Sequence, residues 1–112
     1  MTLRDKVALG MSLPHRSPDP LQLTTIRTVA CRAEELGYRD LWVTENTVDD
    51  GTCFDPVVAL SFAASITKRI GVGAAVIVLP IHHPLTVAHQ WATLDFISGG
   101  RDRKSTRLNS SH

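Results

Sequence analysis

The sequence predicts an α/β fold in which three parallel strands alternate with three helices. Short apolar runs of strand length alternate with segments whose apolar residues recur at helical spacing, and a proline or a glycine marks most of the boundaries. Each helical segment is long enough to return the chain to the same end of the sheet, so successive strands pair in parallel. With 112 residues, 43% apolar and 21% charged, the chain has the composition of one soluble globular domain at most.

The first unit combines an apolar run at residues 7–13 with a helical segment. The run ends at Pro14 and carries no charge, the pattern of a strand buried on both faces. Asp19 is a capping residue, and Pro20 suits the first helical position. The apolar positions that follow at helical spacing, before Gly37 ends the helix, are Ile26, Val29, Ala30, Ala33 and Leu36.

The second unit begins with a short strand at residues 40–44, which contains Leu, Trp and Val. A polar loop rich in turn-forming residues follows at 45–52. Asp55 and Pro56 then repeat the combination of a capping residue and a proline that starts a helix. We expect this second helix to run to about Thr67.

The third unit has a strand at residues 70–79, which is rich in glycine at first and then reads Val-Ile-Val before Pro80 closes it. His83 and Pro84 start the third helix, which keeps the 3.6-residue period until Gly99 and Gly100.

Three units leave two bare strand edges and a sheet that is only partly covered. No strand carries the protection expected of an edge strand, so the sequence predicts the front of a longer, truncated α/β domain. A self-contained three-stranded protein is the alternative. Residues 102–112 contain a single apolar residue, Leu108, and cannot supply a fourth apolar strand. We expect a domain at 1–101 and a non-native or disordered tail at 102–112.

Charge and hydropathy restrict the possible partners. The longest apolar run, residues 70–81, is too short to span a membrane, and the amino terminus lacks a secretory signal, so the cytoplasm is the expected location. The net charge is +1 and the excess of basic residues lies in the tail, so we expect no binding to nucleic acid or membrane. The cysteines lie far apart, and His82 and His83 are adjacent, so no metal site is expected.

Polar candidates for a site follow the strands at their carboxyl ends, where ligands collect in parallel α/β folds. Glu45 and Asn46 come directly after the second strand, and either could contact a ligand. For Glu45 the alternative is a surface carboxylate near a helix start. His82 and His83 lie between the third strand and its helix, where they could donate to a ligand or cap the helix, and capping is the favoured interpretation.

The third strand is unusual because Gly71, Gly73, Ala74 and Ala75 remove bulk where a buried strand normally holds branched residues. A flat ligand could lie against such a surface. The alternative is layer packing inside a barrel, where small residues oppose large ones.

The order of the motifs resembles the bacterial luciferase-like monooxygenase superfamily of flavin- and deazaflavin-dependent (β/α)8 barrels. The similarity covers about residues 7–101. It is carried by the segments 33–38 (AEELGY), 41–46 (LWVTEN), 55–60 (DPVVAL), 69–76 (RIGVGAAV), 83–84 (HP) and 93–101 (TLDFISGGR), of which the last is the most specific.

The resemblance implies that the chain forms the first three βα units of a truncated TIM barrel. It also implies a cofactor, FMN or the deazaflavin coenzyme F420, whose ring lies at the carboxyl mouth of the barrel. The residues expected at the cofactor are Gly73, Ala74, Ala75, Val76 and His83. A non-proline cis peptide would join Ala75 and Val76, since family members carry one in the third strand.

By the same resemblance, Glu45 and Asn46 are the expected catalytic residues. Deazaflavin-dependent members often have Asp-His at these positions, so the choice of cofactor stays open. The implied function is an oxidoreductase of the monooxygenase class that acts on a small organic substrate and forms a homodimer at full length. The isolated chain is expected to be inactive, because the phosphate contacts come from later parts of the barrel. The alternative is a non-enzymatic partial barrel that serves as an assembly or interaction module.

Overall fold

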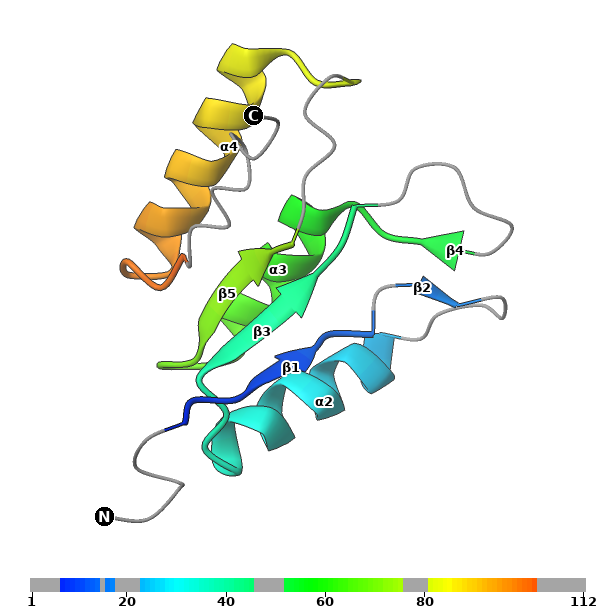
Figure 1. The fold of residues 1–112 in the computed structure, drawn as a ribbon, viewed down its shortest axis with the longest axis vertical. Coiled ribbons are helices and arrows are strands. Elements are labelled where there is room, and N and C mark those ends of the chain that lie inside the picture. Colours follow the sequence, from blue (N-terminus) through cyan, green and yellow to red (C-terminus); the bar gives the residue numbers. More distant parts are fainter. Residues whose placement is uncertain (1–6, 15, 18–22, 46–51, 76–80, 103–112) are drawn as a thin grey trace.

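The computed structural model describes residues 7–14, 16–17, 23–45, 52–75 and 81–102. Within these ranges three strands and three helices alternate as predicted (Figure 1). Two further short strands form a separate pair. The α/β class and its three βα units are therefore confirmed.

Three parallel strands form the main sheet in the order β1-β3-β5. β1 spans Gly10–Ser12, β3 spans Asp40–Val43 and β5 spans Gly71–Ala74. The backbone pairing continues past these bounds, because the N–H of Leu13 donates to the carbonyl of Trp42 at 2.9 Å. The parallel register brings the carboxyl ends of all three strands to one edge, where the predicted site residues lie.

The helices are α2 (Leu23–Glu35), α3 (Pro56–Ser65) and α4 (Pro84–Ile97). α3 contacts β3, β5 and α2, and α4 packs against α3 (Figure 1). The second and third helices begin where the sequence predicts, with Asp55 and His83 as their caps. The predicted start of the first helix at Asp19 and Pro20 lies outside the described residues.

Glycines follow α2 and α4, as expected. Gly37 follows α2 with φ of +87°, a conformation that residues with a side chain rarely adopt, and its N–H donates to the carbonyl of Glu34. No described helix has both the length and the apolar character needed to cross a membrane.

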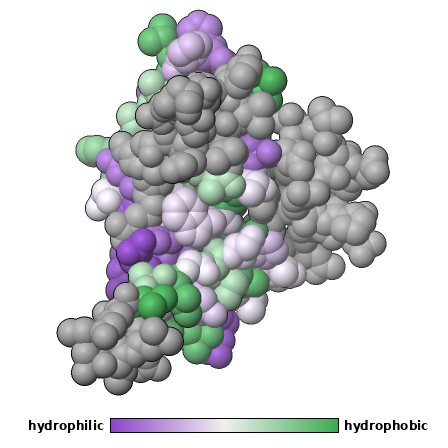
Figure 2. Space-filling view, in the orientation of Figure 1, coloured by the Kyte–Doolittle hydropathy of each residue, from purple (hydrophilic) through white to green (hydrophobic). Residues whose placement is uncertain are grey.

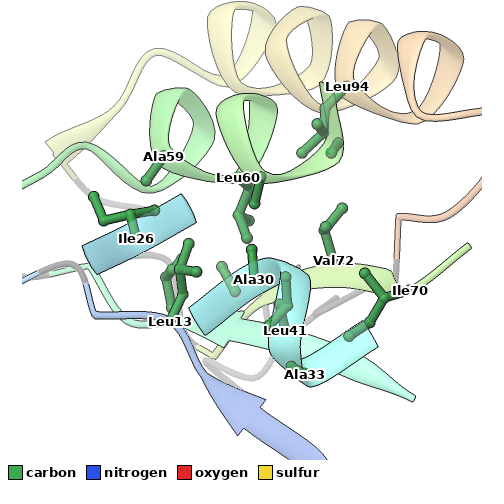
Figure 3. Close-up of a cluster of buried hydrophobic side chains, with 14 residues drawn as sticks. Leu13, Ile26, Ala30, Ala33, Leu41, Ala59, Leu60, Ile70, Val72 and Leu94 are labelled. Atoms are coloured by element: carbon green, nitrogen blue, oxygen red, sulfur yellow. The ribbon is translucent and has the colours of Figure 1, made fainter. Parts of the chain in front are cut away.

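One hydrophobic core joins the sheet to the helices (Figure 3). Leucine and valine side chains from the strands meet alanines and larger apolar residues of α2 and α3. The fully buried side chains of largest volume are Leu13, Ile26, Leu41, Leu60, Ile70, Leu94, Val43 and Val72. α3 carries small alanines on the face that meets this core, which lets the helix approach the sheet closely.

The prediction that residues 7–13 are buried on both faces is wrong for this chain. Val7 is 45% and Leu9 60% exposed, whereas Leu13 is fully buried. The reason is topological: among the described residues β1 pairs on one side only, with β3, so part of its apolar surface is uncovered. Figure 2 shows hydrophobic surface near the amino-terminal end of the described chain.

The sequence predicts loops around β2 (Arg16–Ser17) and β4 (Thr52–Cys53), but in the structure these segments pair in a two-stranded antiparallel sheet. The two segments follow β1 and β3, respectively. Their pairing therefore joins the two segments that follow the carboxyl ends of β1 and β3.

Two charged side chains bind the backbone at the amino-terminal end of β5, opposite the edge where the predicted site residues lie. The carboxylate of Glu34 in α2 accepts hydrogen bonds from the backbone N–H groups of Lys68, Arg69 and Ile70 at 2.7–3.1 Å. Burial alone would raise the pKa of Glu34, but these N–H groups and the charge of Arg69 outweigh it and leave the pKa below its ordinary value.

Arg101 is the second of these side chains. Its guanidinium donates to the carbonyls of Ala64, Thr67, Ile70 and Ser98, and to the hydroxyl of Thr67. It thereby joins the carboxyl ends of α3 and α4 to the start of β5, where a cation also complements the dipole of α3.

The chain then returns to the sheet beside β5. The N–H of Val72 donates to the carbonyl of Arg101 at 3.0 Å, and Val72 pairs with Asp102 in a single parallel bridge. Asp102, which the sequence analysis assigns to the tail, thus lies alongside the edge of the sheet. The predicted boundary at residue 101 stays a prediction.

Candidate functional site

The carboxyl edge of the sheet holds a pair formed by a carboxylate and an imidazole. Glu45 follows β3, and His82 lies in the segment that leads into α4. The Nε2 atom of His82 lies 2.5 Å from Oε2 of Glu45, so a ring N–H there donates to the carboxylate. The side chain of Glu45 is only 2% exposed and that of His82 is 24% exposed.

The burial of Glu45 excludes the alternative interpretation, a surface carboxylate, whereas contact with a ligand stays a prediction. A surface carboxylate near a helix start would be largely exposed, whereas Glu45 lies inside and has a specific partner. A buried carboxylate requires such a partner, because removing its charge from water is costly. Glu45 is thus placed at the predicted edge of the sheet.

His83 and Asp55 act as helix caps. The Nδ1 atom of His83 accepts a hydrogen bond from the N–H of Leu85 at 3.1 Å, and Oδ2 of Asp55 accepts one from the N–H of Val58 at 3.1 Å. Capping, the favoured interpretation of the histidine pair, therefore holds for His83, whereas His82 faces Glu45. A contact between His83 and a cofactor stays a prediction.

β5 ends at the same carboxyl edge of the sheet. Gly73 and Ala74 are buried and Ala75 is exposed, and the N–H of Ala75 donates to the carbonyl of Val43 at 2.8 Å. Val72 and Ala74 belong to the core that the helices cover, so Gly73 points to the other face of the strand. The small residues thus add little side-chain bulk where β5 ends, and of the three only Ala75 is exposed.

A small cavity lies between the pair and the helices. It has a volume of about 10 Å³ and is lined by Glu45, Asp55, Pro56, Val57, His82, Val87, Gln90 and Trp91. This volume corresponds to about one water molecule. This cavity is therefore too small to enclose a flat ring.

Two predicted site residues, Asn46 and Val76, lie outside the described residues, as does the peptide bond between Ala75 and Val76. Among the residues that the structure does describe, no three His, Cys, Asp or Glu side chains gather as they would around a metal ion.

Sequence reasoning did not pair His82 with Glu45, and it did not single out Trp42. The two pair members are 37 positions apart, and only the parallel register brings their loops together. The indole of Trp42 lies so close to Gly10 that a Cβ atom there would be 2.6 Å from its Nε1 atom. A glycine on a strand next to a strand that carries a tryptophan is the signal that could have indicated this contact.

Comparison with known proteins identifies a family. The family described as luciferase-like monooxygenase matches residues 7–103. The 4-hydroxyprotoasukamycin monooxygenase of Streptomyces nodosus subsp. asukaensis is 41% identical over 69 residues, which are 61% of this chain and 19% of that protein. The alkanal monooxygenase alpha chain of Photorhabdus luminescens is 36% identical over 72 residues, 63% of this chain and 20% of that protein.

Solved structures share the fold. The coenzyme F420-dependent tetrahydromethanopterin reductase of Methanopyrus kandleri superposes with a TM-score of 0.70 at 29% identity, covering 94% of this chain and 30% of that one. The oxygenating constituent of 3,6-diketocamphane monooxygenase from Pseudomonas putida, solved in complex with FMN, has a TM-score of 0.74 at 23% identity, covering 85% and 28%. The chain spans about a fifth of the length of the two curated relatives.

Proposed function

Because the chain belongs to the luciferase-like monooxygenase family, we propose that it supplies the first three βα units of a (β/α)8 oxidoreductase that uses FMN or coenzyme F420. The proposed reaction is a monooxygenation or hydride transfer on a small organic substrate. The observation that carries the proposal is the carboxyl edge of the sheet, which holds both the Glu45–His82 pair and the small residues that end β5.

The residues at this edge suit contact with one face of a flat ring that carries polar groups along its edge. Gly73 and Ala74 add little bulk and Ala75 is exposed, so a ring can approach the backbone there. Glu45 and His82 bring a carboxylate and an imidazole into the same region. In the proposed enzyme, residues 73–76 and His83 would hold the ring, and Glu45 and Asn46 would face its polar edge or the substrate.

When bound, the cofactor would supply the redox step, by transferring hydride or by activating oxygen. The residues of this chain would bind and orient the reactants and exclude water. Buried Glu45 keeps a charge close to the mouth at a position that its hydrogen bond fixes. The antiparallel pair of β2 and β4 restrains the chain around the mouth.

The experiment that tests this function uses the longer protein that we propose carries these units, called the complete protein below. It is titrated with FMN and with F420, and binding is followed by fluorescence. Saturable binding of one cofactor at one equivalent per chain supports the proposal. Absence of binding by both contradicts it and favours the alternative, a non-enzymatic assembly module.

Turnover is assayed with the reduced cofactor and two probe compounds. A straight-chain alkanal is chosen because a relative is named alkanal monooxygenase, and limonene because another is limonene 1,2-monooxygenase. We also propose that the complete protein is a homodimer, which sedimentation measures directly; a monomer at all concentrations would contradict this part alone.

A further inference from the structure

We infer that His82 is the residue that holds a proton at the mouth of the site, and that Glu45 is the buried carboxylate that positions it. This inference deepens the proposed function and rests on it. The sequence suggests a catalytic Glu45 because this residue follows β3, but the contact with His82 indicates that the carboxylate acts through the imidazole.

The difference in burial between the two side chains supports the assignment of proton transfer to His82 and of positioning to Glu45. The side chain of Glu45 is 2% exposed and lies behind its partner, whereas the side chain of His82 is 24% exposed. A molecule that arrives from the solvent therefore meets the imidazole before it meets the carboxylate. A buried carboxylate that receives a ring N–H holds the imidazole in one orientation and one tautomer.

The contact also determines which ring atom is available for chemistry. Because Nε2 donates its proton to Oε2 of Glu45, a neutral His82 ring has its lone pair on Nδ1. Nδ1 can take a proton from an acidic O–H or N–H group of a bound substrate. That bond breaks, its electron pair stays on the substrate atom, and the new imidazolium is balanced by the carboxylate of Glu45.

The other side chains around the cavity do not compete for this role. Asp55 faces the same cavity, but one of its carboxylate oxygens caps α3 through the N–H of Val58. Gln90 and Trp91, from α4, have no group that titrates near neutral pH. His83 has its Nδ1 atom engaged with the N–H of Leu85.

The first test measures the tautomer of the ring in the complete protein. Nitrogen chemical shifts of 15N-labelled histidines distinguish the two neutral tautomers, and a His82→Gln variant assigns the signal. We expect His82 to be almost wholly the Nε2–H tautomer, and Glu45→Ala to bring its ring signals close to those of the exposed His89. A Nδ1–H tautomer, or a ring signal that Glu45→Ala leaves unchanged, would overturn the inference.

The second test measures turnover of the reduced cofactor with a phenol, a probe that has the acidic O–H group on which Nδ1 would act, and with limonene, which has no O–H or N–H group. For the phenol we expect His82→Ala to lower kcat about 100-fold, to change cofactor affinity less than about twofold, and to recover part of its activity when free imidazole is added. Glu45→Ala lowers kcat without such recovery, because its imidazole is still present but poorly oriented. His89→Ala, at an exposed position of α4, is the matched control and should keep full turnover.

A His82→Ala variant with turnover within about threefold of the parent would contradict the inference. Failure of the unmodified protein to bind FMN or F420 would instead contradict the proposed function, and the ring measurement would still decide the role of the pair. If neither probe is turned over, the tautomer measurement alone supports or overturns the inference.

Discussion

Gly10 illustrates how one missing side chain shapes the sheet. It lies on β1 beneath the indole of Trp42 on β3, where a Cβ atom would approach Nε1 to 2.6 Å and Cδ1 to 2.7 Å. Real Cβ atoms do not approach other atoms so closely, so a larger residue must displace the indole or bend the strand.

We therefore predict that Gly10→Ala destabilises the complete protein by about 1–3 kcal/mol, the usual cost of overpacking. Urea unfolding followed by fluorescence measures this difference. In a Trp42→Leu background the same substitution should cost much less, because the two sites are coupled. An equal cost in both backgrounds would show that the indole is not the cause.

Glu34 shows how one carboxylate can order a turn. Its oxygens accept from three successive backbone N–H groups, at Lys68, Arg69 and Ile70, just before β5 begins. These bonds favour the ionised carboxylate and lower its pKa from the ordinary value of 4.5.

We predict that Glu34→Gln lowers the free energy of unfolding by about 1–2 kcal/mol at neutral pH. This is less than a fully buried carboxylate would contribute, because solvent screens a partly exposed group. Because the folded-state pKa is depressed, this stabilisation is present above the ordinary pKa and is lost as the pH falls through the folded-state value. The difference between parent and variant should therefore shrink on acidification below 4.5. Unfolding titrations over a range of pH measure it.

The neighbouring glutamate provides the control. Glu35 is 62% exposed and pairs with Arg32 on the surface of α2, an interaction of small value. Glu35→Gln should change stability little at any pH. A pH dependence equal to that of Glu34→Gln would show that general charge effects, and not the backbone contacts, cause the result.

At the scale of the elements, Arg101 holds two helices and a strand together. Its planar guanidinium donates in several directions at once, to carbonyls at the end of α3, to Ile70 before β5 and to Ser98 after α4. A lysine ammonium is a single point of charge and cannot match this geometry.

We predict that Arg101→Lys lowers the thermal unfolding midpoint of the complete protein almost as much as Arg101→Ala, corresponding to about 2–3 kcal/mol. Arg32→Lys, on the exposed surface of α2, serves as the control and should have little effect. If Arg101→Lys retained the parent stability, charge at the helix end and not the guanidinium geometry would be the main contribution.

At the scale of the whole molecule, the sheet has uncovered surface. Val7 and Leu9, together with Leu36 and Tyr38, line a hollow of about 700 Å³ at the amino-terminal edge of the sheet. α3 is apolar on nearly every side, and large apolar side chains of α3 and α4 are uncovered: Val58, Leu85 and Phe96 are each more than 60% exposed. Helices of this kind are normally covered by further structure.

We predict that residues 1–112 alone aggregate and bind no stoichiometric flavin, because strand edges and apolar surface remain available for pairing. Size-exclusion chromatography and equilibrium dialysis with FMN test both parts. Tight binding of FMN at one equivalent would contradict the prediction, as would a compact monomer that unfolds cooperatively.

Local sequence signals predicted most of the fold. Asp55 with Pro56 and His83 with Pro84 marked the starts of two helices, and Gly37 marked the end of another, because capping and backbone conformation depend on neighbouring residues only. The strand positions followed from short apolar runs. The small sheet of β2 and β4 could not be predicted, since each strand has two residues and no recognisable pattern.

The amino-acid sequence by itself determined the alternation of strands and helices, the family and the edge of the sheet at which Glu45 would lie. Only the tertiary structure decided that Glu45 is buried against His82 while His83 caps α4, and that Trp42 covers Gly10. The physical reason is that element type depends on interactions between near neighbours. A contact across 37 positions depends instead on the register of parallel strands and on how the loops at their ends pack.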